Sequence, residues 1–464
     1  MSFPRYPEVK VSGVEWLGEV PAHWDIFPMK RDLEFLTSGS RGWASHYADD
    51  GAAFIRIGNL TRDHIHLDLT DLQRVNVPNG SEGERTKVKA GDVLFSITAY
   101  LGSVAVVSDG IETAYVSQHV ALARLFKRRL LPGWVAYVTL SDVGKNYLSS
   151  QGYGGTKIQL SLEDVADLLV TAPPLCEQAS ITSFLDHETA RIDALIEEQK
   201  RLIELLKEKR QAVISHAVTK GLDPDVPMKD SGVEWLGEVP AHWKVGRVKN
   251  VASFITSGPR GWSDYLTESG EEIFVQSGDL DDHIGVNFEN AKRIRSPMGA
   301  EGARTRINCG DVLVCITGAN TGRVAVSDLP PVSAFINQHL SLVRLDQVGA
   351  LPEFLGYALS SESTQSFFRL EQYGLKEGLS LSDVADAPLV LPPKYEQELV
   401  IKYLKDQTQR LDRLAIDAER SVELLQERRS ALISAAVTGK IDVRGWQPPE
   451  LSSAHVGAAQ MEGV

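Results

Sequence analysis

Two hydrophobic patterns alternate along the 464 residues of the chain. Segments 12–175 and 231–394 contain short runs of alternating and β-branched apolar residues opened by Gly-Asp turns, such as Val93–Thr98, and these runs predict strands. Segments 176–219 and 395–438 follow paired prolines, lack proline and glycine, and end close to a glycine. Each predicts one long helix, because proline is tolerated at a helix start and glycine marks a helix end.

Apolar residues in both predicted helices recur with a period near 3.5, which indicates a coiled-coil seam. The linker 220–230 is polar, and its reach of at most ~40 Å is shorter than a helix of about 42 residues, roughly 60 Å long. We therefore expect the helices to pair antiparallel with pseudo-two-fold symmetry, with pairing between two chains as the alternative. The predicted seam contains Leu185, Ile192, Leu195, Leu202, Leu206, Val213, Leu404, Leu411, Leu414, Ala418, Ser421, Leu425 and Leu432.

The chain is an internal duplication. The sequence SGVEWLGEVPAHW at Ser12–Trp24 recurs unchanged at Ser231–Trp243, an offset of 219 residues. With one-residue slips, the offset persists as far as the Ala-Val-Thr sequences at 217–219 and 436–438. Both copies therefore contain a strand-rich part and a helix, and a repeat of this kind decides the architecture.

We expect a mixed α/β (α+β) fold with two similar globular domains, each followed by a long helix. The predicted divisions are a first domain 1–175, a helix 176–219, a linker 220–230, a second domain 231–394, a helix 395–438 and a tail 439–464. Beyond Gly445 the sequence predicts a loose tail.

Composition excludes several classes of protein. Hydrophobic residues make up 43% of the chain and charged residues 24%, which is average for a folded globular protein. Neither a membrane span nor a signal peptide is recognisable, so we expect a cytoplasmic protein without a membrane partner. The net charge of −14 lacks the basic signature of proteins that hold DNA by phosphate neutralisation alone. A role in nucleic-acid binding therefore requires local basic loops or a basic partner.

No catalytic constellation is recognisable. Dinucleotide-binding, phosphate-loop and zincin motifs are all incomplete, and three cysteines are too few for a disulfide framework or a zinc site. His119 and His339 lie in alternating strand-like runs, which favours structural hydrogen bonding over catalysis. Asp92 and Asp311 are most simply turn residues. We therefore expect a non-enzymatic chain that binds no cofactor or metal.

Duplicated loops carry the remaining chemistry. In Ser38–Trp43 an arginine stands beside a glycine and a tryptophan. The arginine can contact phosphate or bases and the tryptophan ring can stack on a base. Burial of the tryptophan in the core is the equal alternative. Cations in the Gly-containing loop 82–87 can contact phosphate, with a solvated loop as the alternative. A Gly turn at 153–159 can enter a groove or be only a turn. The candidate DNA-binding residues are Arg41, Trp43, Arg85, Lys87, Lys157, Gln159, Arg260, Trp262, Arg304, Arg306 and Lys376.

The order domain, helix, domain, helix resembles the specificity subunits of type I restriction-modification enzymes. The resemblance rests on the doubled SGVEWLGEVPAHW, on Leu160–Val165 followed by Pro173-Pro174, and on the helix ends Glu208–Ile214 and Glu427–Ile433. It extends to about Arg444. It implies that the globular parts are target recognition domains, each reading half of a bipartite DNA site, and that the helices set the gap.

The resemblance also implies partners. Two adenine methyltransferase subunits that bind S-adenosylmethionine would dock on this chain, and the assembly can add two restriction subunits that use ATP and Mg. The agreement between the two copies predicts chemically related half-sites. Buried aromatics are typical interface anchors, so the partner-binding candidates are Trp16, Leu17, Trp24, Trp235, Leu236 and Trp243, unless these residues only brace each domain. The alternative functions are a duplicated coiled-coil scaffold that binds protein without DNA, and an unrecognised enzyme.

Overall fold

The protein divides into two compact units in a computed structural model, which describes residues 3–14, 16–78, 81–153, 158–297, 299–346, 349–372 and 378–447. Unit 1 contains Met1–Gln199 and Arg420–Val464, and unit 2 contains Lys200–Glu419. The expected mixed α/β fold is confirmed. The units do not follow the predicted divisions, because each contains part of both long helices. No described helix has an apolar stretch long enough to cross a membrane.

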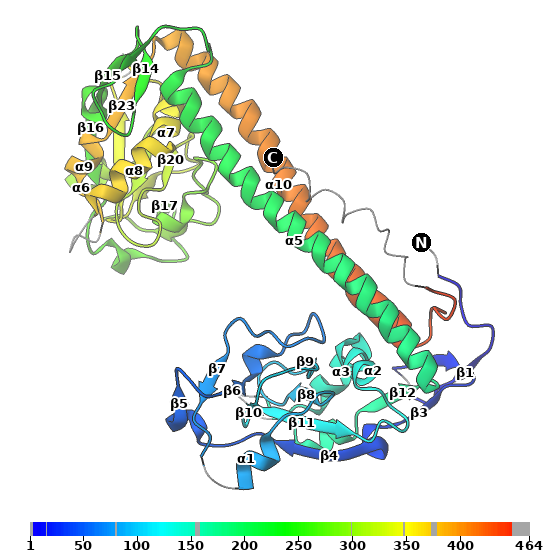
Figure 1. The fold of residues 1–464 in the computed structure, drawn as a ribbon. Coiled ribbons are helices and arrows are strands. Elements are labelled where there is room, and N and C mark those ends of the chain that lie inside the picture. The colour runs from blue at the N-terminus through cyan, green and yellow to red at the C-terminus, as the bar shows by residue number, and fades with distance from the viewer. Residues whose placement is uncertain are drawn as a thin grey trace, which may run out of the picture. The chain divides into compact units, whose positions relative to one another are not determined.

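Two four-stranded sheets form the globular part of unit 1 (Figure 1). One has the order β4-β11-β8-β9 and is antiparallel throughout. The other has the order β10-β6-β7-β5, with β10 parallel to β6. The strands are β4 (Leu33–Ser38), β5 (Tyr47–Ala48), β6 (Ala52–Ile55), β7 (Gln73–Val75), β8 (Val93–Ser96), β9 (Val104–Val106), β10 (Ala114–Val116) and β11 (Val120–Leu125).

The first sheet of unit 1 is buried on both faces. Val93 and Phe95 belong to the core cluster that includes α2 (Pro132–Leu140) and the start of α5, whereas Leu94 and Leu122 belong to the cluster shared with the second sheet. Since successive strand residues face opposite sides of a sheet, this double burial explains why Val93–Ser96 is almost continuously apolar.

Short helices and two-stranded pairs complete unit 1. The strand pairs are β1 (Val9–Val11) with β2 (Glu19–Pro21) and β3 (Asp25–Pro28) with β12 (Leu169–Ala172). The helices are η1 (Met29–Asp32), η2 (Trp43–His46), η3 (Ile57–Asn59), α1 (Ser81–Thr86), α3 (Asp142–Gln151) and α4 (Leu162–Ala166).

Unit 2 repeats this architecture. Its antiparallel sheet has the order β16-β22-β19-β20, and its second sheet has the order β18-β17-β21. The strands are β13 (Met228–Asp230), β14 (Glu238–Pro240), β15 (Lys244–Arg247), β16 (Ala252–Ser257), β17 (Glu272–Val275), β18 (Lys292–Ile294), β19 (Val312–Cys315), β20 (Val324–Val326), β21 (Ala334–Ile336), β22 (Leu340–Leu345) and β23 (Pro388–Leu391). The helices are η4 (Val248–Asn250), η5 (Trp262–Tyr265), η6 (Ser277–Asp279), α6 (Ala300–Thr305), α7 (Pro352–Ser360), α8 (Glu362–Glu371) and α9 (Leu381–Asp386).

The long helices are α5 (Leu175–Lys220) and α10 (Lys394–Val437), and the predicted helix ends lie within one residue of these bounds. Within unit 1, Asp193 of α5 pairs with Arg429 of α10, and the earlier residue Leu185 shares a core with the later residue Val437. The two segments in unit 1 therefore run antiparallel.

The helix segments of unit 2 also run antiparallel. Arg210 of α5 pairs with Asp412 of α10 at 3.1 Å, and Val218 shares a core with Leu404. Arg210 and Asp412 are the repeat counterparts of Arg429 and Asp193, so each unit contains the same interhelical ion pair.

The predicted seam is partly wrong. Leu195, Leu202 and Leu414 are 37%, 42% and 47% exposed, and Ile196 and Ile203 are buried instead. Adjacent apolar residues define two overlapping stripes on a helix, and periodicity alone does not choose between them. The seam positions that are buried as predicted are Leu185, Ile192, Leu206, Leu404, Leu411 and Ala418.

Both ends of the described chain close the core of unit 1. Val443 is buried in the main core, and the ring of Trp446 lies edge-on to Phe184 at 5.5 Å. The Asp442 amide donates to the Pro4 carbonyl oxygen at 2.8 Å. The first part of the predicted tail, residues 439–447, is therefore packed against the domain.

Candidate nucleic-acid interface

The candidate interface of unit 1 lies at one edge of the antiparallel sheet. Strand β4 ends at Ser38 and β8 ends at Ser96, and both pair with the first residues of β11, as Ala121 with Ser38 and Val120 with Ser96. The loops that follow β4 and β8 and the loop that precedes β11 consequently lie together. We call this place the recognition edge.

Glycine allows the loop after β4 to pass close to its neighbour. A Cβ on Gly39 would lie 2.1 Å from the carbonyl oxygens of both Val116 and Ser117, so no other residue fits without moving the backbone. The next residue, Ser40, donates its amide to the Val116 carbonyl at 3.0 Å, and its hydroxyl lies 2.8 Å from that of Thr86. The loop that carries Arg41 is thus fixed in position.

Helix α1 and the residue that follows it add two cations to the recognition edge. The Arg85 guanidinium donates to the Ser38 carbonyl at 3.0 Å and to the Thr37 hydroxyl. Lys87 follows and forms a backbone bridge with Tyr115. Arg41, Arg85 and Lys87 all have exposed side chains, so the structure brings these three predicted residues together.

Unit 2 contains the same arrangement. Its recognition edge is defined by the pairs Ser257–Ser341 and Cys315–Leu340, and a Cβ on Gly258 would lie 2.2 Å from the Asn337 carbonyl oxygen. Arg304 donates to the Thr256 hydroxyl at 2.7 Å, as Arg85 does to Thr37. The exposed cations are Arg260, Arg304 and Arg306.

The structure corrects the prediction for the two tryptophans. Trp43 and Trp262 are 3% and 2% exposed, so neither presents its ring to a base. Trp43 stacks on Phe54 at 5.7 Å, and Trp262 stacks on Phe274 at 6.2 Å. Both rings anchor the second sheet, which is the alternative that the sequence left open.

The other end of the recognition edge contains Gln159. Its side chain is exposed, and its backbone bridges to Thr98 in the loop after β8. The histidines considered above are hydrogen-bonded here, His119 to Gln118 at 3.2 Å and His339 to the Thr317 hydroxyl. The predicted residues Lys157 and Lys376 lie outside the described residues.

Two tyrosines near Gln159 were not predicted. Tyr100, in the loop after β8, is 59% exposed, and Tyr153, which pairs with Gln159, is 58% exposed. Exposed aromatic rings suit stacking on bases. The loop depends on a positive φ of 60° at Ala99, and nothing in the sequence indicates that conformation.

The duplicated Gly-Asp turns are structural. Asp92 is buried and accepts two hydrogen bonds from Arg124, both at 2.7 Å, and Asp311 is held by Arg344 in the same way. Hydrogen bonding to Asp92 raises the pKa of Arg124. Arg124 thus holds the turn that opens β8, and Arg344 holds the turn that opens β19.

Most of the predicted partner-binding residues are buried. Trp24 and Trp243 are almost completely buried and donate to Glu177 at 3.0 Å and to Glu396 at 2.8 Å, so they brace each domain against the start of its helix. This corrects their prediction as interface anchors. Leu17 and Leu236 are also buried. Trp16 is 46% exposed beside Tyr147, and Trp235 is half-buried beside Phe367.

Among the described residues, no group of three or more His, Cys, Asp or Glu side chains is arranged to hold a metal ion. The exposed side chains at the recognition edges are cationic, aromatic and amide groups. Such groups bind phosphates and base edges.

Comparisons with known proteins identify relatives over almost the whole chain. The specificity subunit of the type I restriction enzyme EcoKI from Escherichia coli K12 is 23% identical over 96% of both chains. A putative specificity subunit of the type I restriction enzyme MjaX from Methanocaldococcus jannaschii is 23% identical over 92% of this chain and 96% of its own. No protein-family model matches. These relatives confirm the resemblance to specificity subunits.

Solved structures share the fold. A chain from a study of complex assembly and conformational transition of the type I R-M system has a TM-score of 0.70 at 18% identity, covering 90% of this chain and 98% of that one. The crystal structure of the HsdS subunit from Thermoanaerobacter tengcongensis has a TM-score of 0.51 at 17% identity, covering 91% and 98%.

Proposed function

We propose that this chain, whose relatives are specificity subunits of type I restriction enzymes, is the DNA-recognition subunit of such an enzyme and is not itself catalytic. The observation that supports the proposal is the duplicated recognition edge. Each unit presents three exposed cations on loops fixed by the same glycine and the same arginine-to-threonine hydrogen bond. Each edge would read one half of a bipartite site, and its cations would supply local positive charge on a chain whose net charge is −14.

Duplicated exposed leucines on the long helices support docking of two equivalent partner subunits. Leu195 and Leu424 are exposed in unit 1, and Leu414 and Leu205 are exposed in unit 2. The repeat relates Leu195 to Leu414 and Leu205 to Leu424, so each unit has one leucine of each kind. Large exposed apolar residues on a regular element mark interaction surfaces. We assign these faces to two adenine methyltransferase subunits, in place of the buried tryptophans.

The remaining parts of the proposal follow from this assignment. The antiparallel helix segments of both units would belong to one continuous coiled coil with pseudo-two-fold symmetry, which would fix the gap between half-sites. S-adenosylmethionine would be bound by the methyltransferases, and ATP and Mg by any restriction subunits that join the assembly.

Genome-wide mapping of methylated adenines, with and without this gene, tests the proposal. We expect one bipartite methylation motif to disappear when the gene is removed. If every motif survives in a host whose partner methyltransferase is active, the recognition role is refuted.

A variant pair tests the recognition edge itself. Arg41→Ala with Arg260→Ala removes one cation from each edge, and we expect target binding by the assembled complex to weaken about tenfold or more in a filter or anisotropy assay. Arg128→Ala removes an exposed arginine just beyond the opposite end of β11 and serves as the control. Equal weakening by the control would show a nonspecific charge effect.

A further inference from the structure

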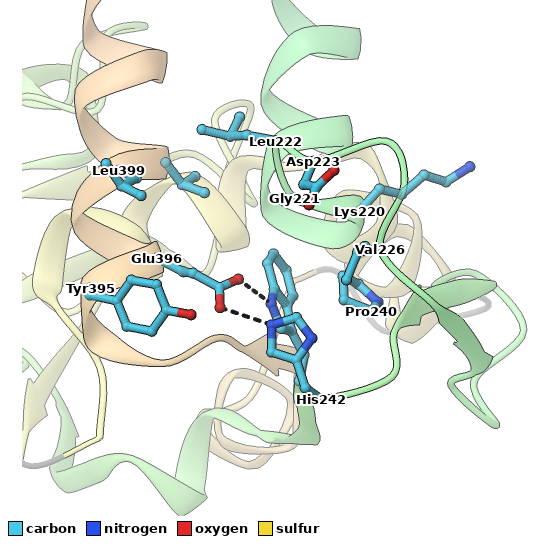
Figure 2. A pocket seen from close by; sticks show the side chains of 12 residues that line it. Lys220, Gly221, Leu222, Asp223, Val226, Pro240, His242, Tyr395, Glu396 and Leu399 are labelled. Carbon is cyan, nitrogen blue, oxygen red and sulfur yellow. Dashed lines mark hydrogen bonds and ion pairs between the residues drawn. The ribbon is translucent and has the colours of Figure 1, made fainter.

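Unit 2 contains an open pocket between the linker and the start of α10 (Figure 2). Its volume is about 330 Å³, and its walls include Leu222, Trp243, Glu396 and Leu399. Leu399 is 55% exposed and Tyr395 is 63% exposed. The pocket is therefore mainly apolar, open to solvent, and lined by side chains that are usually covered.

One carboxylate gives the pocket its polarity. Glu396 accepts hydrogen bonds from the Trp243 indole and from His242, both at 2.8 Å (Figure 2). The Tyr395 hydroxyl also donates a hydrogen bond to this carboxylate. The two carboxylate oxygens together have about four lone pairs, so Glu396 can accept one more donor besides Trp243, His242 and Tyr395.

Unit 1 contains the same residues with an occupant. Glu177 accepts hydrogen bonds from Trp24 and His23, as Glu396 does from Trp243 and His242. A third donor is the Tyr6 hydroxyl, at 2.7 Å, to the oxygen that Trp24 also contacts. The Tyr6 ring lies edge-on to Trp24 at 5.6 Å and is buried.

Unit 2 lacks the aromatic side chains that cover this place in unit 1. The repeat offset places exposed Asp225 where unit 1 has Tyr6. It also places Tyr403, which is 39% exposed, where unit 1 has Phe184 packed against Phe3 and Trp446. Unit 2 therefore retains the tryptophan and the glutamate without the buried Tyr6 and Phe184 side chains that cover them in unit 1.

We propose that this pocket receives a tyrosine side chain from an extended segment of a separate protein chain. The phenol ring would pack against the exposed Leu222 and Leu399, and its hydroxyl would donate to Glu396, as Tyr6 does to Glu177. In this chain Phe3 and Tyr6 are already engaged within unit 1, so a second copy has no such segment to offer. A different protein is therefore favoured as the source of the tyrosine. The proposal concerns a contact outside the recognition edges and does not depend on DNA binding.

A peptide with the chain's own occupant sequence provides the probe. Fluorescently labelled Phe-Pro-Arg-Tyr-Pro-Glu, the sequence of residues 3–8, is titrated with the full chain and followed by anisotropy. We expect saturable binding, and about tenfold or greater weakening when alanine replaces the tyrosine of the peptide, since a buried aromatic anchor carries much of the energy of such contacts. Absence of saturable binding at millimolar peptide, or equal binding of both peptides, overturns the proposal.

Matched protein variants place the binding in the pocket. Leu399→Glu should abolish binding, whereas Ser180→Glu, at the exposed counterpart position in unit 1, should leave it unchanged. Asp225→Tyr restores the aromatic residue of unit 1 and should also weaken binding. Peptide binding that survives Leu399→Glu overturns the assignment. A concentration-dependent doubling of mass that Leu399→Glu removes would assign the pocket to a second copy of this chain and would equally overturn it.

Discussion

At the scale of single residues, the duplication provides internal controls. Asn59 in unit 1 and Asp279 in unit 2 occupy equivalent positions, and each side chain accepts a hydrogen bond from the backbone amide three residues earlier, at 2.9 and 2.7 Å. Burial raises the pKa of Asp279 above its ordinary value of 3.8. In unit 1 the neutral amide of Asn59 makes the same hydrogen bond without the cost of burying a charge.

Asp279→Asn should therefore stabilise unit 2 at neutral pH. An acid with a raised folded-state pKa stabilises the fold fully only below its unfolded pKa, here near 3.8, and that contribution is lost as the pH rises through the folded value. Urea unfolding of both proteins at pH 4 and pH 7 measures the effect. The advantage of the variant should appear at pH 7 and shrink at pH 4, and an advantage independent of pH would contradict the explanation.

Glu177 has a larger structural role than its counterpart. Its side chain is buried and accepts hydrogen bonds from Tyr6, His23 and Trp24. Glu396 accepts from His242, Trp243 and the exposed Tyr395 in a more open setting. Removal of the acceptor leaves buried donors without partners, which is costly.

Glu177→Ala should lower the free energy of unfolding by about 3 kcal/mol, more than Glu396→Ala does. Chemical denaturation followed by tryptophan fluorescence measures both. A smaller loss for Glu177→Ala than for Glu396→Ala would show that Tyr6 adds nothing to the cluster.

Residue roles were the least predictable part of the sequence. The Arg-Gly-Trp pattern at Arg41–Trp43 identified the loop but not the direction of each side chain, and the structure exposes the arginine and buries the tryptophan. Burial depends on Phe54 and Tyr115, which are distant in sequence. Tyr100 was missed because its position depends on backbone geometry after β8.

At the scale of elements, the boundaries of the long helices were predictable and their contact face was not. Pro173-Pro174 and Pro392-Pro393 mark the starts to within a residue. The choice between Leu195 and Ile196 required the partner helix, since both residues are apolar neighbours. Two of the leucines left outside the seam, Leu195 and Leu414, are among those that we assign to partner docking.

Leu195→Glu with Leu424→Glu should remove one docking face. We expect the number of methyltransferase subunits per chain to fall from two to one, as measured by native mass spectrometry, because the equivalent leucines of unit 2 are intact. Leu69→Glu, at an exposed leucine in a loop of unit 1, is the matched control. Retention of both methyltransferases by the helix variant would refute the docking assignment.

At the scale of the whole molecule, the two recognition edges are similar but not identical. Their cations and glycines correspond, yet the loop after β8 contains Tyr100 where the loop after β19 contains Gly318–Thr321 without an aromatic residue. The hypothesis of related half-sites therefore applies best to contacts of the cationic loops, and the loops after β8 and β19 should distinguish the halves.

Replacement of Thr98–Gly102 by the sequence of Thr317–Gly322 tests this division. The exchange should change bases in one half of the methylation motif and leave the other half and the gap unchanged, because each edge belongs to one unit. Methylation mapping reads all three features at once. A change in both halves would show that the edges do not act independently.

The discontinuous composition of unit 1 determines the order in which the domains can be completed during synthesis. Unit 2 is one uninterrupted segment, so the ribosome delivers it whole. The core of unit 1 includes Trp24 and Phe184, which are translated early, but also Ile433, Ala436 and Val437, which are translated near the end. The first domain to be made is therefore the last to close, and until then its apolar surface is open to chaperones and to aggregation. A premature stop after Glu419 would damage the N-terminal domain, although that domain is translated first. It would spare unit 2, which is translated just before the stop.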